Sequence, residues 1–241
     1  MRVLYCTDTY PPQVNGVSIV TALSLAGLGR RGWECAVVAP RYPPSQAVED
    51  GAPAVDARDE AEVVAVPSTA LPMYPDVRLA LPSSSPARDL MRRFQPDLVH
   101  STTEISIGRM GQRLAAAAGV PSVSSYHTDF ARYANAYGLP GITGLVSSYI
   151  GRFHRRSRRV YTPSVPARDE LARLGVDRVE VWGRGVDTEL FHPAAGARSS
   201  GPRSGWAAAS PSSTWGGSRR RSGPTWWSTR FGLRAPCCHV A

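Results

Sequence analysis

The chain of 241 residues carries 28 arginines and no lysine against 19 acidic residues, a formal net charge of +9. This length suffices for one large domain or two small ones. No apolar run is long enough to cross a bilayer, and the first residues lack the charged-then-apolar pattern of a signal peptide. A cytoplasmic location is therefore expected.

The positive charge is concentrated at one end. Residues 194–241 contain seven arginines and no acid, so residues 1–193 contain 21 arginines and all 19 acids, a net charge of only +2. Arginine without lysine is also what GC-rich codons produce. The body of the chain therefore shows no nucleic-acid-binding charge pattern, and nucleic acid is not an expected partner.

The cysteines indicate neither a disulfide nor a metal site. Cys6 and Cys35 fall in predicted strands, where a free cysteine packs as a small apolar side chain. Cys237 and Cys238 are adjacent near the end, and no spacing typical of metal ligands occurs.

The first seventeen residues combine a strand, a loop and the start of a helix. The apolar run Val3–Cys6 predicts a parallel strand buried on both faces. A loop with Asn15 and Gly16 follows, and from Val17 apolar residues recur at helical spacing. Backbone N–H groups at such a helix start favour a phosphate or another anion. The loop lacks both the three-glycine dinucleotide fingerprint and the lysine-containing P-loop, so an ordinary turn is the alternative.

Strands and helices alternate along the following chain. Strands are predicted at residues 34–39, 62–67, 97–100, 120–126, 160–162 and 179–182, and helices at 17–28, 85–94, 107–118, 130–137, 142–156 and 166–174. Residues 73–82 are ambiguous between a loop and an edge strand. Because parallel strands need helical crossovers, this alternation predicts an α/β, doubly wound parallel sheet of Rossmann-like type.

Polar segments follow four of the predicted strands. They are Asn15-Gly16, Ser101–Glu104, His127–Asp129 and Arg184–Asp187. Ligands of doubly wound sheets bind beyond the carboxyl ends of the strands. These segments are therefore predicted to line one site.

Five segments, in order, resemble the N-terminal half of glycosyltransferase family 4, retaining enzymes of the GT-B fold. They are TDTYPPQVNGV at Thr7–Val17, RRGWECAVVAP at Arg30–Pro40, PDLVHSTTE at Pro96–Glu104, SYHTDFARYANAYG at Ser125–Gly138 and GRGVDTELFHP at Gly183–Pro193. The likeness is greatest to bacterial transferases that use GDP-mannose, or a related nucleotide sugar, to glycosylate a lipid acceptor. The resemblance implies a nucleotide diphosphate sugar as donor substrate, a lipid or glycan acceptor, and neither cofactor nor metal.

The resemblance also implies catalytic roles for two residues. His127 would lie beside the transferred sugar and support the developing oxocarbenium charge through its imidazole or its backbone carbonyl. Asp129 would orient His127 or bind an acceptor hydroxyl. The alternative for Asp129 is a helix N-cap before Phe130, which is equally compatible with the sequence.

Substrate binding is expected of four further residues. Asn15 and Gly16 would let their loop approach the donor diphosphate and the acceptor. Glu104 and Arg184 are expected to line the cleft, although a strand end would explain Glu104 and a turn would explain Arg184.

The arginine-rich segment Arg152–Arg159 has two interpretations. It could contact anionic lipid head groups at the inner face of the membrane, in keeping with a lipid acceptor. A solvated helix face is the simpler explanation.

Residues 194–241 differ in character from the preceding chain. They hold four of the six tryptophans among Ser, Gly, Arg and Pro clusters, whereas disordered segments are poor in aromatic residues. Read from the third base of each codon, residues 212–231 permit VVYVGRLAxEKRxDVVVDAV, which resembles the start of the donor domain in this family. We therefore predict an acceptor-side domain over residues 1–193 and a disordered or frameshifted basic tail over residues 194–241. A chain without donor-binding residues is expected to be inactive alone.

Three other functions compete with this one. A different GT-B-like protein, such as a sugar phosphorylase or a nucleotide-sugar epimerase, is disfavoured by HTDF and by the PQVNGV loop. A non-catalytic binding domain that uses the arginine-rich tail would show affinity for anions that falls steeply with salt. A nicotinamide dehydrogenase is disfavoured because no G-x-G-x-x-G follows the first strand.

The frameshift hypothesis predicts the outcome of resequencing the coding DNA from the codon of Leu190 onward. We expect one extra or missing base, followed by a long open frame. That frame should encode the arginine of GRL and the lysine of EK, two short motifs within the string given above. An intact frame would contradict the hypothesis and would make residues 194–241 a genuine basic tail.

Overall fold

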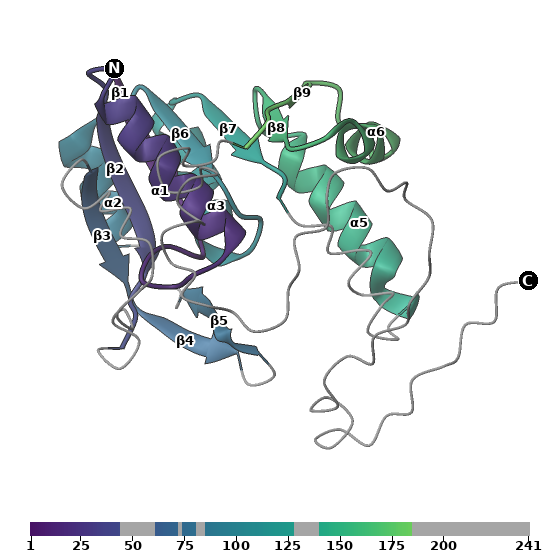
Figure 1. The fold of residues 1–241 in the computed structure, drawn as a ribbon, viewed down its shortest axis with the longest axis horizontal. Coiled ribbons are helices and arrows are strands. Elements are labelled where there is room, and N and C mark those ends of the chain that lie inside the picture. The colour runs from purple at the N-terminus through teal and green to yellow at the C-terminus, as the bar shows by residue number, and fades with distance from the viewer. Residues whose placement is uncertain (44–60, 72–73, 81–84, 128–139, 185–241) are drawn as a thin grey trace, which may run out of the picture. The chain divides into compact units, whose positions relative to one another are not determined.

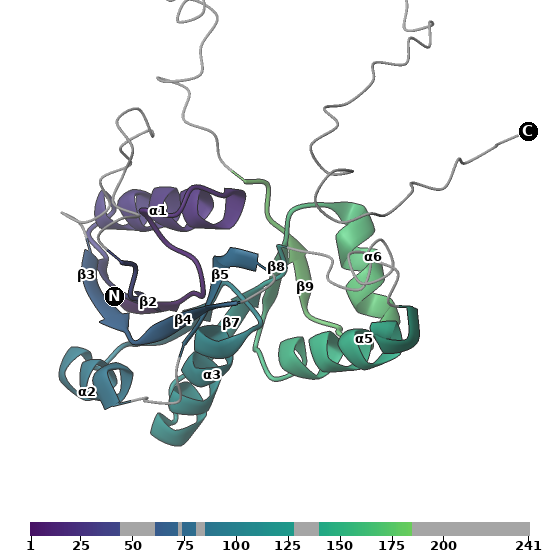
Figure 2. The same cartoon turned by 90° about the horizontal axis from the view of Figure 1, so that it is seen from below.

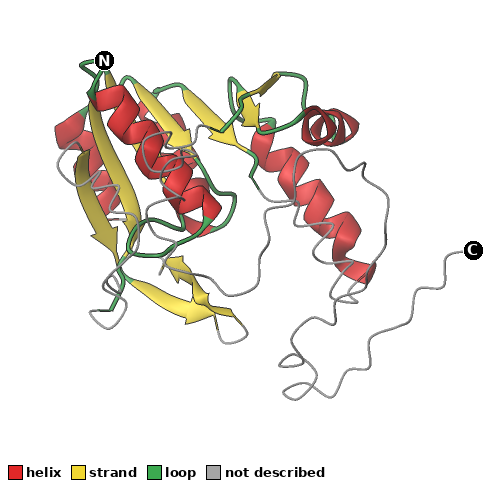
Figure 3. Cartoon of the chain, viewed as in Figure 1, coloured by secondary structure: helices red, strands yellow, loops and turns green. Residues whose placement is uncertain are grey.

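A parallel sheet forms the centre of the described part of the chain, and its strands alternate with helices along the sequence (Figures 1 and 3). The computed structural model describes residues 1–43, 61–71, 74–80, 85–127 and 140–184. All of them belong to one unit, Met1–Asp187, whereas the second unit, Thr188–Ala241, lies outside the described residues.

The seven strands of this sheet are all parallel to their neighbours. They are β1 (Arg2–Cys6), β2 (Glu34–Pro40), β3 (Ala61–Val66), β6 (Leu98–Ser101), β7 (Ser122–Ser125), β8 (Val160–Thr162) and β9 (Val179–Val181). Their order is β3-β2-β1-β6-β7-β8-β9, so the chain winds outward from β1 in both directions. This confirms the predicted doubly wound, Rossmann-like sheet.

Helices cover both faces of the sheet. They are α1 (Gly16–Gly29), α2 (Ser85–Phe94), α3 (Ser106–Ala118), α5 (Pro140–His154) and α6 (Val165–Arg173). Figure 2 shows α1 on one face and α2 and α3 on the other. No helix in the described ranges is both long and apolar enough to cross a bilayer.

Successive side chains of β1 point to opposite faces of the sheet, and the core is therefore divided into two layers. Leu4 and Cys6 pack in one cluster with Leu90 of α2 and Ile107 of α3. Tyr5, on the opposite face of the same strand, packs with Leu25 of α1. The apolar run in β1 therefore serves two faces at once, as the sequence predicted.

A separate β-hairpin corrects the assignment of residues 73–82. β4 (Ser68–Leu71) and β5 (Tyr74–Ala80) pair antiparallel in a sheet of their own, with a register shift between Ala70 and Leu71. Residues 74–80 are therefore a strand, which belongs to this separate two-stranded sheet and not to the main sheet. The four residues of β4, Ser-Thr-Ala-Leu, are too few to give a clear strand pattern in the sequence.

Two glycines allow α3 to approach the sheet closely. A Cβ atom on Gly108 would lie 1.7 Å from the carbonyl oxygen of Thr103, and one on Gly111 would lie 2.5 Å from Sγ of Cys6. Both distances are far below van der Waals contact, so neither site tolerates a side chain without movement of its neighbours.

We therefore predict that Gly111→Ala lowers the free energy of unfolding by about 1–3 kcal/mol, the usual cost of overpacking a core. Gly144→Ala is the matched control, because a Cβ on Gly144 of α5 meets nothing within 4 Å. The control should gain up to about 1 kcal/mol from helix propensity. Urea unfolding of both variants checks this, and equal stabilities would contradict it.

Candidate functional site at the carboxyl edge of the sheet

Three of the predicted site residues come together at the carboxyl edge of the sheet. Arg184, which follows β9, donates from Nη2 to the carbonyl oxygen of His127, which follows β7, at 3.1 Å. Nη1 of Arg184 lies 3.7 Å from the position that a Cβ on Gly16 would take. The start of α1, the end of β7 and the end of β9 therefore meet around one guanidinium group.

The start of α1 is shaped by Asn15. Its Oδ1 accepts from the backbone N–H groups of Val17 and Ser18, at 3.1 and 2.9 Å, and its Nδ2 donates to Oγ1 of Thr9 at 2.6 Å. These contacts make Asn15 the N-cap of α1 and hold the loop before it. Direct contact between Asn15 and a substrate stays a prediction.

Gly16, unlike Asn15, is exposed at the first position of α1. The cap is a neutral amide, so the positive end of the helix dipole is not cancelled by a carboxylate. Together with the guanidinium of Arg184, this helix start offers an anion two independent sources of attraction.

His127 lies mostly buried beside this helix start. Burial, together with the charges of Arg184 and His154, lowers the pKa of His127 to about 4. The ring is therefore neutral near pH 7. Its Nδ1 is buried and has no hydrogen-bond partner among the described residues.

Glu104 is buried in the segment that follows β6, and it faces α5. Its Oε1 lies 3.2 Å from Nε2 of His154, and its backbone carbonyl accepts from the hydroxyl of Tyr149. Burial raises the pKa of Glu104, and the contact with His154 opposes that shift. Its predicted substrate-binding role stays a prediction, as does the role of Asp129, which lies outside the described residues.

Sequence reasoning missed Asp8, which caps α3 from the loop after β1. The position before α3 is Ile105, whose side chain cannot accept a hydrogen bond. Oδ1 of Asp8 accepts instead from the backbone N–H groups of Ser106 and Ile107, at 3.0 and 2.8 Å, and Oδ2 accepts from Oγ1 of Thr103 at 2.6 Å. The signal for this contact lies in the topology, because Asp8 and Ser106 are 98 positions apart.

A cavity of about 600 Å³ lies at the opposite, amino edge of the sheet. Its rim includes Arg158, Arg159, Arg178 and Glu180, and Leu98 and Val123 are among its apolar lining residues. We place the functional site at the carboxyl edge, because the residues that carry the sequence pattern converge there. Among the described residues, no group of three or more His, Cys, Asp or Glu is arranged to hold a metal ion.

The fold and the site define a class of protein. It is an α/β protein in which a helix start with a neutral cap lies at the carboxyl edge of a doubly wound parallel sheet. The profile of Glycosyltransferase Family 4 matches residues 14–190, and the chain belongs to this family. The resemblance inferred from the five sequence segments is confirmed.

Curated relatives align with most of the length of this chain. It is 35% identical over 195 residues, or 81% of its length, to a GDP-mannose-dependent alpha-mannosyltransferase of Mycobacterium tuberculosis, and 34% identical over the same share to a Mycolicibacterium smegmatis protein of the same name. It is 26% identical over 71% of its length to the alpha-monoglucosyldiacylglycerol synthase of Streptococcus pneumoniae, of which it covers 37%. The chain spans half the length of the two mycobacterial relatives.

A solved structure supports the fold. Sucrose-phosphate synthase from Thermosynechococcus elongatus superposes with a TM-score of 0.57 at 13% identity, over 82% of this chain and 51% of that chain. At this identity the likeness supports the fold alone.

The buried ring of His100 leads to a prediction about pH. Burial lowers the pKa of His100 to about 3, below the ordinary value of 6.5. Between these pH values the unfolded chain binds a proton that the folded protein does not, so stability falls as the pH falls below 6.5. The loss from this group should approach 1.4 kcal/mol per pH unit.

We expect His100→Gln to reduce the slope of unfolding free energy against pH between about pH 6 and 4. His127 contributes in the same direction and Glu104, with its raised pKa, in the opposite one, so the comparison of the two slopes isolates His100. Urea unfolding at several pH values measures both slopes. Equal slopes in the variant and the parent protein would contradict the prediction.

Proposed function

We propose that this chain forms the acceptor-side half of a retaining glycosyltransferase, which transfers mannose from GDP-mannose to a lipid or glycan acceptor. The observation that carries the proposal is the meeting of Gly16, His127 and Arg184 at the carboxyl edge of the sheet. The names of the mycobacterial relatives support the choice of GDP-mannose. The family match favours this function over a sugar phosphorylase or a nucleotide-sugar epimerase.

The proposed site suits a donor with a diphosphate group. The diphosphate would lie at the start of α1, where the absence of a side chain on Gly16 lets it approach the backbone N–H groups. The guanidinium of Arg184, which also binds the carbonyl of His127, would donate to the phosphate oxygens.

His127 suits the cationic character of the transition state. In the transfer, the bond between the sugar and the diphosphate breaks, and an acceptor oxygen forms the new bond on the same face of the sugar. The acceptor proton passes to the departing diphosphate. Because the lowered pKa keeps its ring neutral, His127 would add no positive charge beside the oxocarbenium-like sugar, and its carbonyl has a second lone pair for a sugar hydroxyl.

The acceptor is proposed as a lipid or a glycan. The name of the streptococcal relative refers to a diacylglycerol lipid, which supports a lipid as the acceptor. In the segment Arg152–Arg159, Arg155 donates to the carbonyl of Leu174 and Arg159 pairs with Glu180. Contact of this segment with an anionic membrane stays a prediction.

A fusion protein tests the proposal. Residues 1–187 of this chain are joined to the second half of the Mycobacterium tuberculosis relative, and transfer of radiolabelled mannose from GDP-mannose into lipid and glycan fractions is measured. We expect transfer by the fusion protein. Arg184→Ala and His127→Ala should each lower kcat by about 100-fold, the usual loss when one group that stabilises the transition state is removed.

The matched control is Arg113→Ala, an exposed arginine on α3, which should leave kcat unchanged. Folding of each fusion is verified by its thermal transition. A folded fusion without transfer activity, or equal kcat values for all three variants, would overturn the proposal.

A further inference from the structure

Two consecutive serines at the end of β7 are fully buried. Ser124 and Ser125 are both 0% exposed, and their side chains point to opposite faces of the sheet. A buried hydroxyl is unfavourable unless it is hydrogen-bonded, and serine has a low strand propensity beside the valines used elsewhere in this sheet. Both positions therefore call for an explanation other than apolar packing.

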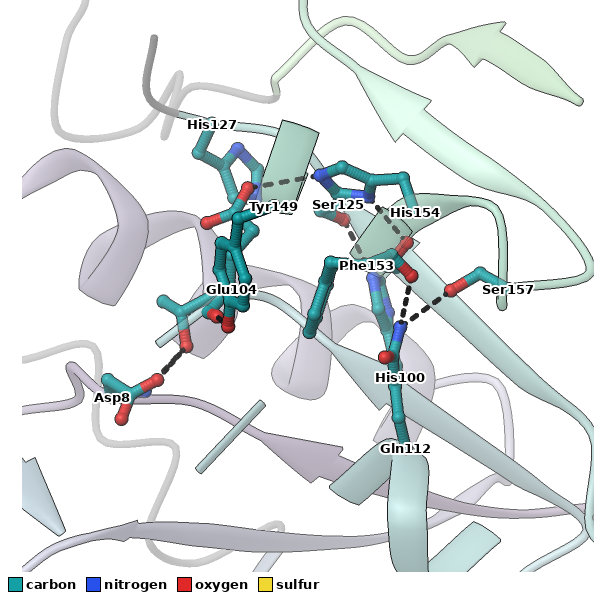
Figure 4. Close-up of polar contacts among 12 residues, drawn as sticks. Asp8, His100, Glu104, Gln112, Ser125, His127, Tyr149, Phe153, His154 and Ser157 are labelled. Atoms are coloured by element: carbon teal, nitrogen blue, oxygen red, sulfur yellow. Dashed lines mark hydrogen bonds and ion pairs between the residues drawn. The ribbon is translucent and has the colours of Figure 1, made fainter. Parts of the chain in front are cut away.

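Each serine is held by a buried histidine. On the α1 face, Oγ of Ser125 lies 2.7 Å from Nε2 of His100, a residue of β6 (Figure 4). On the other face, Oγ of Ser124 lies 2.8 Å from Nδ1 of His154, the last residue of α5. The end of β7 is thus fixed from both sides, and we call these two contacts the histidine clamp.

The clamp extends through His154 to the end of the neighbouring strand. Nε2 of His154 lies 3.2 Å from Oε1 of Glu104, and its ring meets the ring of Tyr126 edge-on, with centroids 5.6 Å apart. One ring of α5 therefore connects the end of β6 to the end of β7. Tyr126 immediately precedes His127, so the contact reaches the chain next to the site.

The position of His127 needs such support. Its Nδ1 has no hydrogen-bond partner among the described residues, and the contact with Arg184 acts on its backbone carbonyl. The direction of the ring is therefore set by the backbone that carries it. A shift of about 1 Å in a reacting group can cost roughly 100-fold in rate.

We propose that His154 is a positioning residue, which acts with Ser124 and Glu104 to hold the end of β7 and thereby fixes His127 beside the transferred sugar. The expected effect on sugar transfer rests on the proposed function. The contacts of His154 with Ser124 and Glu104 do not depend on a bound substrate. Its role differs from that of a core residue, because loss of His154 alters the surroundings of His127 and not only the stability of the fold.

Several charged or titratable groups determine the protonation of His127. Arg184 beyond β9 and His154 on α5 lower its pKa, and it interacts in turn with His100 of β6. Glu104 faces His154, and Asp8 beyond β1 is engaged at the start of α3. The pKa of His127 therefore reports on the clamp.

The test is a titration of His127 in the full chain by NMR, without donor or acceptor. We compare the parent protein with His154→Gln and Ser124→Ala. Ser101→Ala is the matched control, because Ser101 pairs with Ser124 in the sheet register, is equally buried, and donates to the carbonyl of Gly108 instead of a histidine.

We expect His154→Gln to raise the pKa of His127 toward its ordinary value, because His154 is one of the groups that lower it. Ser124→Ala should shift the ring signals of His127, and Ser124→Thr, which keeps the hydroxyl, should restore them. Ser101→Ala should lower the melting temperature and leave the signals of His127 in place. Should His154→Gln fail to fold, the Ser124→Ala and Ser124→Thr pair decides.

Unchanged His127 signals and pKa in folded His154→Gln and Ser124→Ala would overturn the inference and would make His154 a structural residue only. The titration uses no sugar donor, so its outcome is separate from the transfer assay. Changed His127 signals with no transfer by the fusion protein would support the clamp and reject the proposed function. In an active fusion, His154→Gln should lower kcat and leave the KM for GDP-mannose unchanged.

Discussion

The carboxylate of Asp8 is the contact on which the two wings of the sheet depend. It belongs to the loop after the first strand, yet it accepts the N–H groups that open α3, about a hundred residues later. The helix has no cap of its own, so without Asp8 its first turn would leave buried donors unsatisfied. Gly111 brings the same helix against Cys6. Together they hold α3 against β1 where β1 pairs with β6, and this is the point at which the direction of winding reverses and a ligand crevice forms.

The capping of the two helices explains why one of them remains free for an anion. Both α1 and α3 begin at the carboxyl edge, and each helix dipole favours negative charge there. At α3 the chain supplies that charge itself, through the buried carboxylate of Asp8. At α1 the cap is the neutral amide of Asn15, the first residue is an exposed glycine, and the guanidinium of Arg184 lies nearby. Of these two helix starts, that of α1 has no carboxylate partner, and it lies next to His127.

The sequence allowed the prediction of those features that depend on local pattern. The apolar runs of β1 and β2 are buried on both faces, so their burial follows from composition alone. The grouping of His127, Arg184 and Gly16 follows from the rule that parallel strands share a carboxyl edge. Contacts between distant segments could not be predicted in this way. Asp8 contacts α3, and His154 contacts Ser124 and Glu104, only because the topology brings these segments together. The pairing of β4 with β5 depends on the topology in the same way.

Three buried histidines show how the same side chain acquires different roles. His100 and His154 have polar partners for their buried rings, Ser125 for the first and Ser124 with Glu104 for the second. His127 instead carries a buried Nδ1 without a partner among the described residues. An unsatisfied buried polar atom costs about 1–3 kcal/mol of folding free energy. Packing alone gives no reason to keep a histidine at such a position. Of the three histidines in the described ranges, His127 alone has a buried ring nitrogen without a hydrogen-bond partner there, and functional sites often depart from local satisfaction in this way.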